Sequence, residues 1–258
     1  MDKVGPRVAV TGEDAAASAD SVYTGRDNLE VMRHAYHYNR LLLKWISSYA
    51  AGASRIVDFG AGAGAFAIPL VEAGHRVLCI EVDPLFRSIL REHGLPVAAS
   101  LDGLSDSSID FLYAFDVLEH IEHDVHYLKQ WHRKLRPGGR ILVYVPAFPV
   151  LYSSMDRRIG HYRRYRLRSL CAKCRAAGFT VDSAAYVDCV GFLASLAYKL
   201  TDDGTGVIRW RAVRWYDRYV FRLSRKFDPL LGHWLGKNLL ISGHKDQPLS
   251  VTHGDSPG

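Results

Sequence analysis

The sequence has few cysteines and no long apolar run. Its 258 residues include four cysteines, too few for the disulfide framework of a small secreted protein. No apolar stretch reaches the roughly 18 residues that a membrane-spanning helix needs, and no charged leader followed by an apolar segment opens the chain. These absences exclude the disulfide-stapled and membrane-spanning classes. We expect a protein of the reducing cytoplasm.

Charge is distributed unevenly along the chain. The net charge is +6, but residues 1–150 contain 15 Lys and Arg against 18 Asp and Glu, whereas residues 151–258 contain 18 against 9. The basic surplus indicates that the second part meets something anionic, such as an acidic substrate, a phosphate-bearing lipid or a membrane surface. Nucleic acid is an unlikely partner, because no recognised DNA- or RNA-binding module accompanies the charge.

The apolar pattern of the first part predicts strands that alternate with helices. An opening helix is expected over residues 28–50, where Leu41, Leu42 and Trp45 recur at helical spacing. The alternation beyond it predicts a parallel sheet with helices on both faces. The expected strands are 55–59, 76–81, 97–99, 109–114 and 140–145, and the expected helices are 64–73, 84–93 and 122–135, the last ended by Pro137, Gly138 and Gly139.

The pattern changes after Pro146. We expect a loop over 147–166, a helix over 167–177, a strand over 179–187, an apolar helix over 191–200, a basic helix over 207–227 and a last strand over 238–244. The whole pattern predicts an α/β, Rossmann-like, doubly wound fold. It has a mostly parallel seven-stranded sheet, helices on both faces and a C-terminal helical lid.

The stretch from Ile56 to Phe66 is the most informative part of the sequence. Three glycines, Gly60, Gly62 and Gly64, allow a tight turn after a buried strand and let a ligand approach the bare main chain. Glu81 ends the next strand, about 20 residues after the first glycine, where a carboxylate can accept hydrogen bonds from both ribose hydroxyls. Together they predict a ligand that contains a nucleoside.

Two nucleoside cofactors compete for this site. A nicotinamide cofactor usually needs G-x-G-x-x-G, whereas this chain has G-x-G-x-G preceded by Asp58. A carboxylate at Asp58 repels a pyrophosphate but suits the sulfonium and ammonium groups of S-adenosylmethionine. The residues favour the methyl donor.

Five stretches of the sequence resemble class I S-adenosylmethionine-dependent methyltransferases of the bacterial type 11 group. They occur in the family's order over roughly residues 30–150 and are Val57–Gly64, Cys79–Pro84, Ile109–Tyr113, Asp116–Ile121 and Leu135–Arg140. A sixth stretch, from Val145 through Gly160 to Tyr165, is similar to a subgroup described only as class I methyltransferases. The resemblance names no acceptor.

The resemblance implies roles for particular residues. The glycines, with Ala61, would line the methionine part of the cofactor, Asp58 would lie near its ammonium, and Glu81, with Val82 beside it, would hold the ribose. The family often places an acid near Ser100 to meet the adenine. Because Ser100 and Leu101 stand here, that contact is expected from the backbone or from Asp102. The residues expected to flank the cofactor are Phe115 and Asp116.

Histidines supply the candidate catalytic groups. An acceptor hydroxyl or a protonated amine needs a base, which is most often a histidine or a carboxylate. His161 is our first candidate and His120 our second. We predict no metal site, because the repeat of His120, His123 and His126 is typical of this family stretch without metal. Cys171 and Cys174 have no second pair and are expected to be ordinary helix residues.

The loop after the fifth strand is the expected acceptor wall. Its candidate substrate-contacting residues are Tyr152, Tyr162, Arg163, Arg164 and Tyr165; alternatively, the two arginines are solvated or pair with acids of the same fold. Arg211, Arg214, Arg218, Arg222 and Arg225 form one stripe of the basic helix, with Ala212, Val213, Tyr216, Val220, Leu223 and Phe227 opposite. This helix either rests on an anionic membrane or packs on its own domain.

These observations together predict a methyltransferase. The expected acceptor is an oxygen, then a nitrogen, of a small molecule or of a lipid- or sugar-linked metabolite. The alternatives are a membrane-surface enzyme with a lipid acceptor, an NAD(P)-dependent oxidoreductase, and a non-enzymatic sensor of S-adenosylmethionine. We expect a flexible tail over 1–25, a cofactor-binding core over 26–150, an acceptor-side region with the last strands over 151–245, and a second tail over 246–258.

Overall fold

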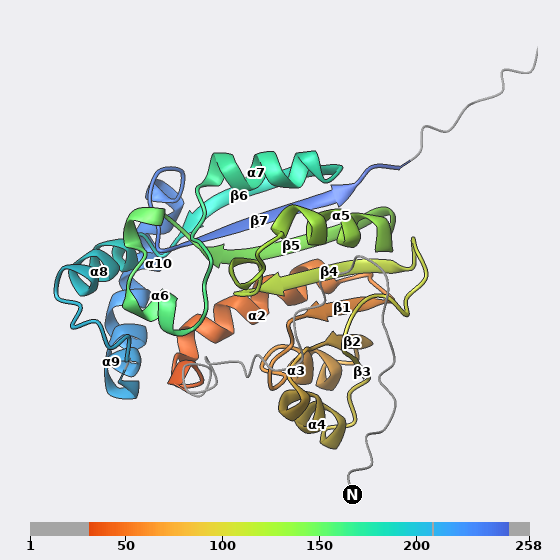
Figure 1. Cartoon of the computed structure of the whole chain (residues 1–258), viewed down its shortest axis with the longest axis horizontal. Helices are drawn as coiled ribbons and strands as arrows, with labels where there is room; N and C mark the ends of the chain where they lie inside the picture. The colour runs from red at the N-terminus through yellow and green to blue at the C-terminus, as the bar shows by residue number, and fades with distance from the viewer. Residues whose placement is uncertain (1–30, 208, 248–258) are drawn as a thin grey trace, which may run out of the picture.

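A seven-stranded sheet forms the centre of the molecule (Figure 1). The computed structural model describes residues 31–207 and 209–247. The strand order is β3-β2-β1-β4-β5-β7-β6, and β7 runs antiparallel to both of its neighbours. The predicted α/β, mostly parallel, seven-stranded fold is therefore confirmed. The strands are β1 (Ile56–Phe59), β2 (Val77–Ile80), β3 (Val97–Ala98), β4 (Ile109–Phe115), β5 (Leu135–Pro146), β6 (Phe179–Val187) and β7 (Asn238–Lys245).

Helices cover both faces of the sheet, as the alternating pattern predicts. One face is covered by α2 (Tyr36–Ala50), α3 (Ala67–Glu72) and α4 (Pro84–Glu92), and the other by α5 (Asp124–Lys134) and α7 (Leu167–Ala176). Strand β4 contributes side chains to the hydrophobic cores on both faces of the sheet. Its Leu112 packs among residues of the α5 and α7 side, and its Phe111 among residues of the α2 side. Burial on both faces explains why the central strands read as continuous apolar runs.

Several predicted boundaries are wrong. The helix expected from Gly64 begins at Ala67, because three glycines with positive φ occupy the preceding turn. The opening helix is broken by a turn before Tyr36. Helix α5 ends at Lys134, before the predicted Pro-Gly-Gly stop, and those residues already belong to β5. The expected loop over 147–166 contains η2 (Pro149–Leu151) and α6 (Ser154–Arg158), and η1 (Leu118–His120) lies between β4 and α5.

The basic helix is not a single α-helix. It consists of α9 (Trp210–Trp215), a π-helical segment η3 (Tyr216–Phe221) and α10 (Arg222–Leu231). A π turn widens the helix and changes which side chains face inward. The buried residues are Asp217, Phe221 and Ser224, whereas Leu223 and Phe227, expected on the packed side, are exposed. The predicted stripe is therefore wrong in register, although its five arginines are exposed as expected.

Buried carboxylates attach this helical segment to the rest of the chain. Asp188 has left-handed backbone geometry before α8 (Cys189–Leu200) and accepts hydrogen bonds from Ser224 Oγ at 2.5 Å and from the Tyr216 hydroxyl. Asp217 accepts hydrogen bonds from the backbone N–H groups of His37 and Tyr38, both at 2.8 Å. Helices α8, α9 and α10 are thereby held beyond the carboxyl ends of the parallel strands (Figure 1).

The four cysteines are buried and free, and Cys171 and Cys174 lie on α7 within the core. In the part of the chain that is described, no helix is both long and apolar enough to cross a bilayer. The tail predicted over 1–25, and residues 248–258 of the second one, lie outside the described residues.

Candidate functional site

The glycine turn leaves bare main chain at the carboxyl end of β1. Gly60 has φ +81° and Gly64 has φ +85°, which L side chains rarely adopt. A Cβ on Gly60 would overlap with the Val117 side chain, and one on Gly64 would lie 2.9 Å from Ile68 Cδ1. The Gly60 N–H donates to the Ile80 carbonyl at 2.8 Å, which fixes the turn against β2. The turn therefore tolerates only glycine at these two positions.

Glu81 reaches from the end of β2 to the same turn. One carboxylate oxygen accepts a hydrogen bond from Gly62 N–H at 2.7 Å, and the other accepts one from Asp83 N–H at 2.8 Å. Burial raises the pKa of Glu81, and these backbone donors partly offset the rise. The sequence prediction that Glu81 and the glycines share one site agrees with this geometry. Each carboxylate oxygen keeps a second lone pair for a ligand hydroxyl.

Asp58 is a buried carboxylate with an unsatisfied oxygen. It is 3% exposed, and within residues 31–207 and 209–247 its Oδ2 finds no hydrogen-bond partner. Burial raises the pKa of Asp58 to about 7; the nearby Tyr113 hydroxyl works against this rise, and Glu81 adds to it. An unpaired buried carboxylate is costly unless a cation or a hydrogen-bond donor meets it. The site therefore fits a ligand with a positively charged group better than one with a pyrophosphate.

The other predicted cofactor residues lie around the same edge in different environments. The Ser100 hydroxyl donates to Asp102 at 2.7 Å, and both residues are exposed at the loop after β3. Leu101 is buried in the core, and Val82 is largely exposed. Phe115 is buried, with its ring 5.7 Å from that of Phe66. Asp102 and Ser100 therefore present the polar atoms of this loop.

Asp116 lies just beyond β4 in a left-handed conformation, with φ +53°. Such geometry is uncommon for a residue other than glycine and is often found at functional sites. Burial within the surrounding protein raises the pKa of Asp116 to about 6, while His161, Lys237 and Tyr38 act in the opposite direction. Solvent still reaches the residue. A ligand at this edge could therefore meet the carboxylate.

His161 is held by a buried acid on the acceptor-side loop. Asp156 Oδ1 lies 2.8 Å from His161 Nδ1 and 2.8 Å from Arg164 Nε, and its other oxygen accepts a hydrogen bond from Ser153 N–H. Burial would raise the pKa of Asp156, but His161 and Arg164 outweigh it and leave the pKa at about 2. Asp156 is therefore ionised and fixes the ring of His161, leaving Nε2 directed toward Glu119.

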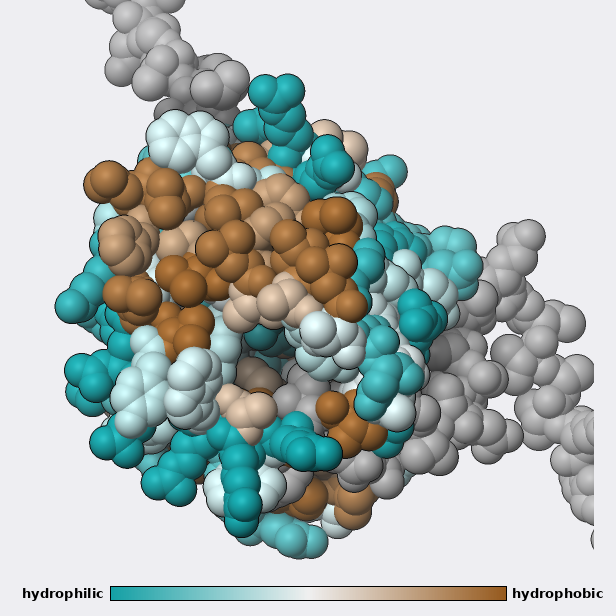
Figure 2. Space-filling model, turned by 90° about the vertical axis from the view of Figure 1, so that its left-hand side faces the viewer, coloured by the Kyte–Doolittle hydropathy of each residue, from teal (hydrophilic) through white to brown (hydrophobic). Residues whose placement is uncertain are grey.

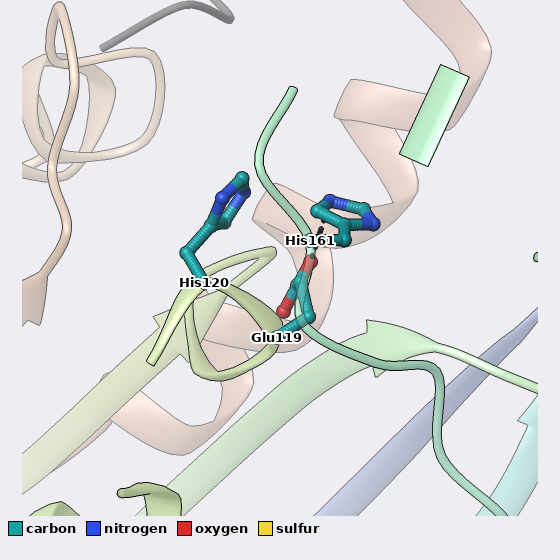
Figure 3. A group of neighbouring side chains, drawn as sticks. All are labelled: Glu119, His120 and His161. Atoms are coloured by element: carbon teal, nitrogen blue, oxygen red, sulfur yellow. Dashed lines mark ion pairs between the residues drawn. The ribbon is translucent and has the colours of Figure 1, made fainter. Parts of the chain in front are cut away.

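Glu119, His120 and His161 form a compact group (Figure 3). One ligand-type atom from each lies within 4.8 Å of the others, and the two histidine rings are 4.6 Å apart. Burial and then His161 lower the pKa of His120 to about 3. Burial and then Asp116 raise the pKa of Glu119 well above its usual value. His123 and His126, which share the sequence repeat, are exposed and do not belong to this group.

The remaining residues of the expected acceptor wall mostly bind the protein itself. Arg163 pairs with Asp124 at 3.0 Å, and the buried Tyr165 hydroxyl donates to the same carboxylate at 2.9 Å. The Tyr152 hydroxyl donates to the His161 carbonyl at 2.6 Å. Tyr162 is 55% exposed. Arg163 and Arg164 thus form the pairs with acids that were the alternative to substrate binding.

Sequence reasoning gave no role to Glu119, Asp188 or Asp217. Glu119 and His161 lie 42 positions apart, and only the packing of the loop against η1 brings them together. Asp156 carried one usable signal, because Ser153 three residues earlier forms a capping-box pattern with it. For Asp217, no local pattern indicates that it caps a helix 180 residues earlier.

Known proteins share this architecture. A family model described as a methyltransferase domain matches residues 32–184. A protein of Mycolicibacterium smegmatis named probable S-adenosylmethionine-dependent methyltransferase is 24% identical over 163 residues, which are 60% of this chain and 61% of that protein. The chain thus spans about three fifths of that relative's length, and less than half of an uncharacterized methyltransferase of Mycobacterium tuberculosis.

Solved structures show the same fold at low identity. A SAM-dependent methyltransferase from Thermotoga maritima superposes with a TM-score of 0.59 at 16% identity, covering 85% of this chain and 95% of that one. A SAM-dependent methyltransferase from Archaeoglobus fulgidus superposes with a TM-score of 0.58 at 17% identity, covering 85% of this chain and 100% of that one. With the family match over more than half of its length, the chain belongs to the class I S-adenosylmethionine-dependent methyltransferases.

Proposed function

We propose that this chain transfers a methyl group from S-adenosylmethionine to an oxygen of a small molecule or of a lipid- or sugar-linked metabolite. One observation carries the proposal: the glycine turn, Glu81 and Asp58, whose Oδ2 is unsatisfied, meet at the carboxyl ends of β1 and β2. This arrangement supports a ligand that has a ribose at one end and a cationic group at the other.

Different residues would bind different parts of the methyl donor. Glu81 would accept hydrogen bonds from the ribose hydroxyls, Asp58 would face the ammonium group, and the turn at Gly60 and Gly64 would accommodate the methionine part. Ser100 and Asp102 are the polar groups available to the adenine. When bound, S-adenosylmethionine supplies an electrophilic methyl group. The protein then has to align an acceptor with it and to exclude water.

His161 is our candidate for the group that takes the proton of an acceptor hydroxyl. Its Nδ1 is engaged by the ionised Asp156, so Nε2 can accept a proton. The same carboxylate stabilises the charged ring that results. His120 is a weaker candidate, because its low pKa makes it a poor proton acceptor near neutral pH.

Turnover tests this proposal. The wild-type chain should release S-adenosylhomocysteine with at least one member of a panel of hydroxyl, carboxylate and amine acceptors. His161→Ala should retain donor affinity and lose turnover with a hydroxyl acceptor by about 10²–10⁴-fold. Full activity of that variant would remove His161 from the mechanism, and absence of turnover with every acceptor would favour a sensor.

A nicotinamide oxidoreductase is the second candidate. The buried Asp58 beside the glycine turn opposes it, because a pyrophosphate at this place would meet a carboxylate. A fluorescence titration separates the two. Binding of NAD(H) or NADP(H) without binding of S-adenosylmethionine would favour the oxidoreductase.

An exposed apolar patch supports an acceptor that lies in a membrane surface. Figure 2 looks onto the carboxyl ends of the parallel strands and shows a continuous apolar area above a hollow, with hydrophilic side chains around it. The patch lies on η2, α8, α10 and the segment after α10, which pack together. The large apolar side chains that are exposed on these elements are Val150, Leu193, Leu200, Leu223, Phe227, Leu230, Leu231 and Trp234.

Basic side chains accompany this patch. Arg222, Arg225 and Lys226 share α10 with it and line a shallow cleft with His37. A neighbouring cleft is lined by His34 and His37 with Arg214, Arg218 and Arg222. Aromatic and aliphatic side chains beside arginines suit the boundary between headgroups and acyl chains. An anionic bilayer is therefore the partner that this face fits best.

A further inference from the structure

The group of Glu119, His120 and His161 has the composition of a metal site. It offers two imidazole nitrogens and a carboxylate, and the three ligand-type atoms lie within 4.8 Å of one another. Figure 3 shows the Glu119 side chain directed toward His161, with the His120 ring on the other side of the gap. Two histidines and one carboxylate are a usual ligand set for divalent first-row transition metals.

Glu119 gives a second and independent indication. The residue is fully buried, and neither of its carboxylate oxygens has a hydrogen-bond partner among the residues that the structure describes. His161 Nε2 lies 3.7 Å from Oε1 of Glu119, which is too long for a hydrogen bond. A buried carboxylate without hydrogen bonds lowers the stability of the fold unless a cation lies beside it. The side chain is thus placed as a ligand whose oxygens receive no hydrogen bond from the described residues.

Asp156 provides the support that metal-binding histidines usually have. A ligating histidine nearly always donates its other ring N–H to a carboxylate or carbonyl, which fixes the direction of the free nitrogen. The 2.8 Å contact between His161 Nδ1 and Asp156 does this and turns Nε2 toward Glu119. Arg164 in turn holds Asp156 at 2.8 Å.

We propose that Glu119, His120 and His161 bind one divalent transition-metal ion of the Zn²⁺, Mn²⁺ or Fe²⁺ type. Tetrahedral ligand bonds of about 2.0–2.2 Å require the three atoms to approach one another by up to about 1.4 Å, within reach of side-chain rotation. Three protein ligands leave an open coordination position, as in catalytic metal sites.

The open position would hold an acceptor oxygen, and this part of the inference rests on the proposed methyltransferase function. A bound cation lowers the pKa of a coordinated hydroxyl and orients it. With the ion present, His161 would be a ligand and the coordinated hydroxyl would lose its proton to water; without the ion, His161 keeps the role of base that the proposed function gives it. The ion also explains why an unsatisfied buried carboxylate lies between a buried and a half-buried histidine beside Asp116.

Cobalt binding tests the site without an assay of activity. The tag-free full-length chain, freed of metal with a chelator, is titrated with Co²⁺ and followed by visible absorption and calorimetry. We expect one ion per chain with ligand-field bands of bound Co²⁺. Glu119→Gln and His161→Asn should weaken binding more than about tenfold, and Asp156→Asn by roughly 10–100-fold. His126→Ala, an exposed histidine of α5, should bind as the wild type does.

Two results would overturn the metal site. One is no Co²⁺ or Zn²⁺ binding by a chain that binds S-adenosylmethionine, which leaves the proposed function intact. The other is equal metal affinity in wild type, Glu119→Gln and His161→Asn, provided that circular dichroism shows all three folded. Metal binding by a chain that fails to bind the methyl donor would instead leave this site standing and contradict the proposed function.

Discussion

At the scale of single residues, Asp58 combines a cost for folding with a benefit for binding. Burial raises its pKa to about 7, so the folded chain holds a proton there that the unfolded chain loses near pH 4. Between these values the folded state binds more protons than the unfolded state. The contribution of Asp58 to the free energy of unfolding therefore falls as the pH rises from about 4 to about 7.

Replacing this carboxylate should change stability and affinity in opposite directions. Asp58→Asn should raise the melting temperature of the ligand-free chain at pH 8 and change it little at pH 5. The same variant should weaken S-adenosylmethionine binding by about 10–150-fold, since a hydrogen bond to a charged group contributes about 1.5–3 kcal/mol. Calorimetric titration and thermal unfolding at both pH values measure the two effects.

The wild-type affinity for the donor should rise from pH 5 to pH 7, where the ligand ammonium stays protonated and Asp58 ionises. Glu72→Gln, an exposed residue of α3, serves as the control and should alter neither quantity. A variant at Asp58 with unchanged affinity at every pH would show that its carboxylate does not meet the ligand.

The glycine turn makes a second prediction at this scale. Gly60→Ala places a Cβ against Val117 in a backbone conformation with φ +81°. We expect it to lower the free energy of unfolding by about 1–3 kcal/mol and to weaken donor binding. Gly103→Ala, with no atom within 4 Å of the added Cβ, is the matched control in a denaturant titration. Equal stability of the two variants would contradict the assigned turn.

At the scale of elements, the C-terminal helical segment is attached to the N-terminal helix. Asp217 on η3 accepts the first free N–H groups of α2 from His37 and Tyr38, both at 2.8 Å. A side-chain acceptor at a helix start contributes about 0.5–2 kcal/mol. This one comes from a distant element, so it also fixes how the two elements pack.

Truncating this carboxylate should loosen that attachment. Asp217→Ala should lower the free energy of unfolding by about 1–2 kcal/mol. Asp217→Asn keeps an acceptor oxygen, so it should lower the free energy of unfolding by less. Hydrogen exchange should show earlier exchange of the first amides of α2 in the alanine variant. Exchange of these amides at the wild-type rate in Asp217→Ala would mean that Asp217 does not hold the helix.

The elements also show how far local patterns reach. The order of the strands follows from patterns within about 20 residues and is confirmed. The glycine turn and Glu81 come from the same local patterns, and a hydrogen bond joins them in the structure. The interruption of the basic helix by η3 was not predictable, because it depends on the packing of Asp217 and Phe221 against α2. The meeting of Glu119 with His161 depends likewise on contacts between distant segments.

At the scale of the whole molecule, charge and apolar exposure meet on one face. The chain should bind vesicles that contain anionic phospholipid and leave neutral phosphatidylcholine vesicles unbound, as measured by flotation. Binding should weaken as salt rises from 50 to 500 mM, because screening shortens the range of the arginine charges. An Arg222→Glu, Arg225→Glu double variant should float less than the wild type. The control is Arg76→Glu, an exposed residue at the amino end of β2, which should float as the wild type does.

The absence of flotation with anionic vesicles at low salt would contradict a membrane-surface enzyme. It would leave a small-molecule acceptor as the remaining proposal. Flotation that persists at high salt would mean that the apolar side chains, rather than the arginines, dominate the attraction.

Donor binding is the central claim, and isothermal titration calorimetry tests it most directly. We predict that the purified chain binds one S-adenosylmethionine, and one S-adenosylhomocysteine, and that Glu81→Ala loses at least about tenfold in affinity while remaining folded. A folded wild-type chain with no measurable heat of binding for either ligand would contradict the account.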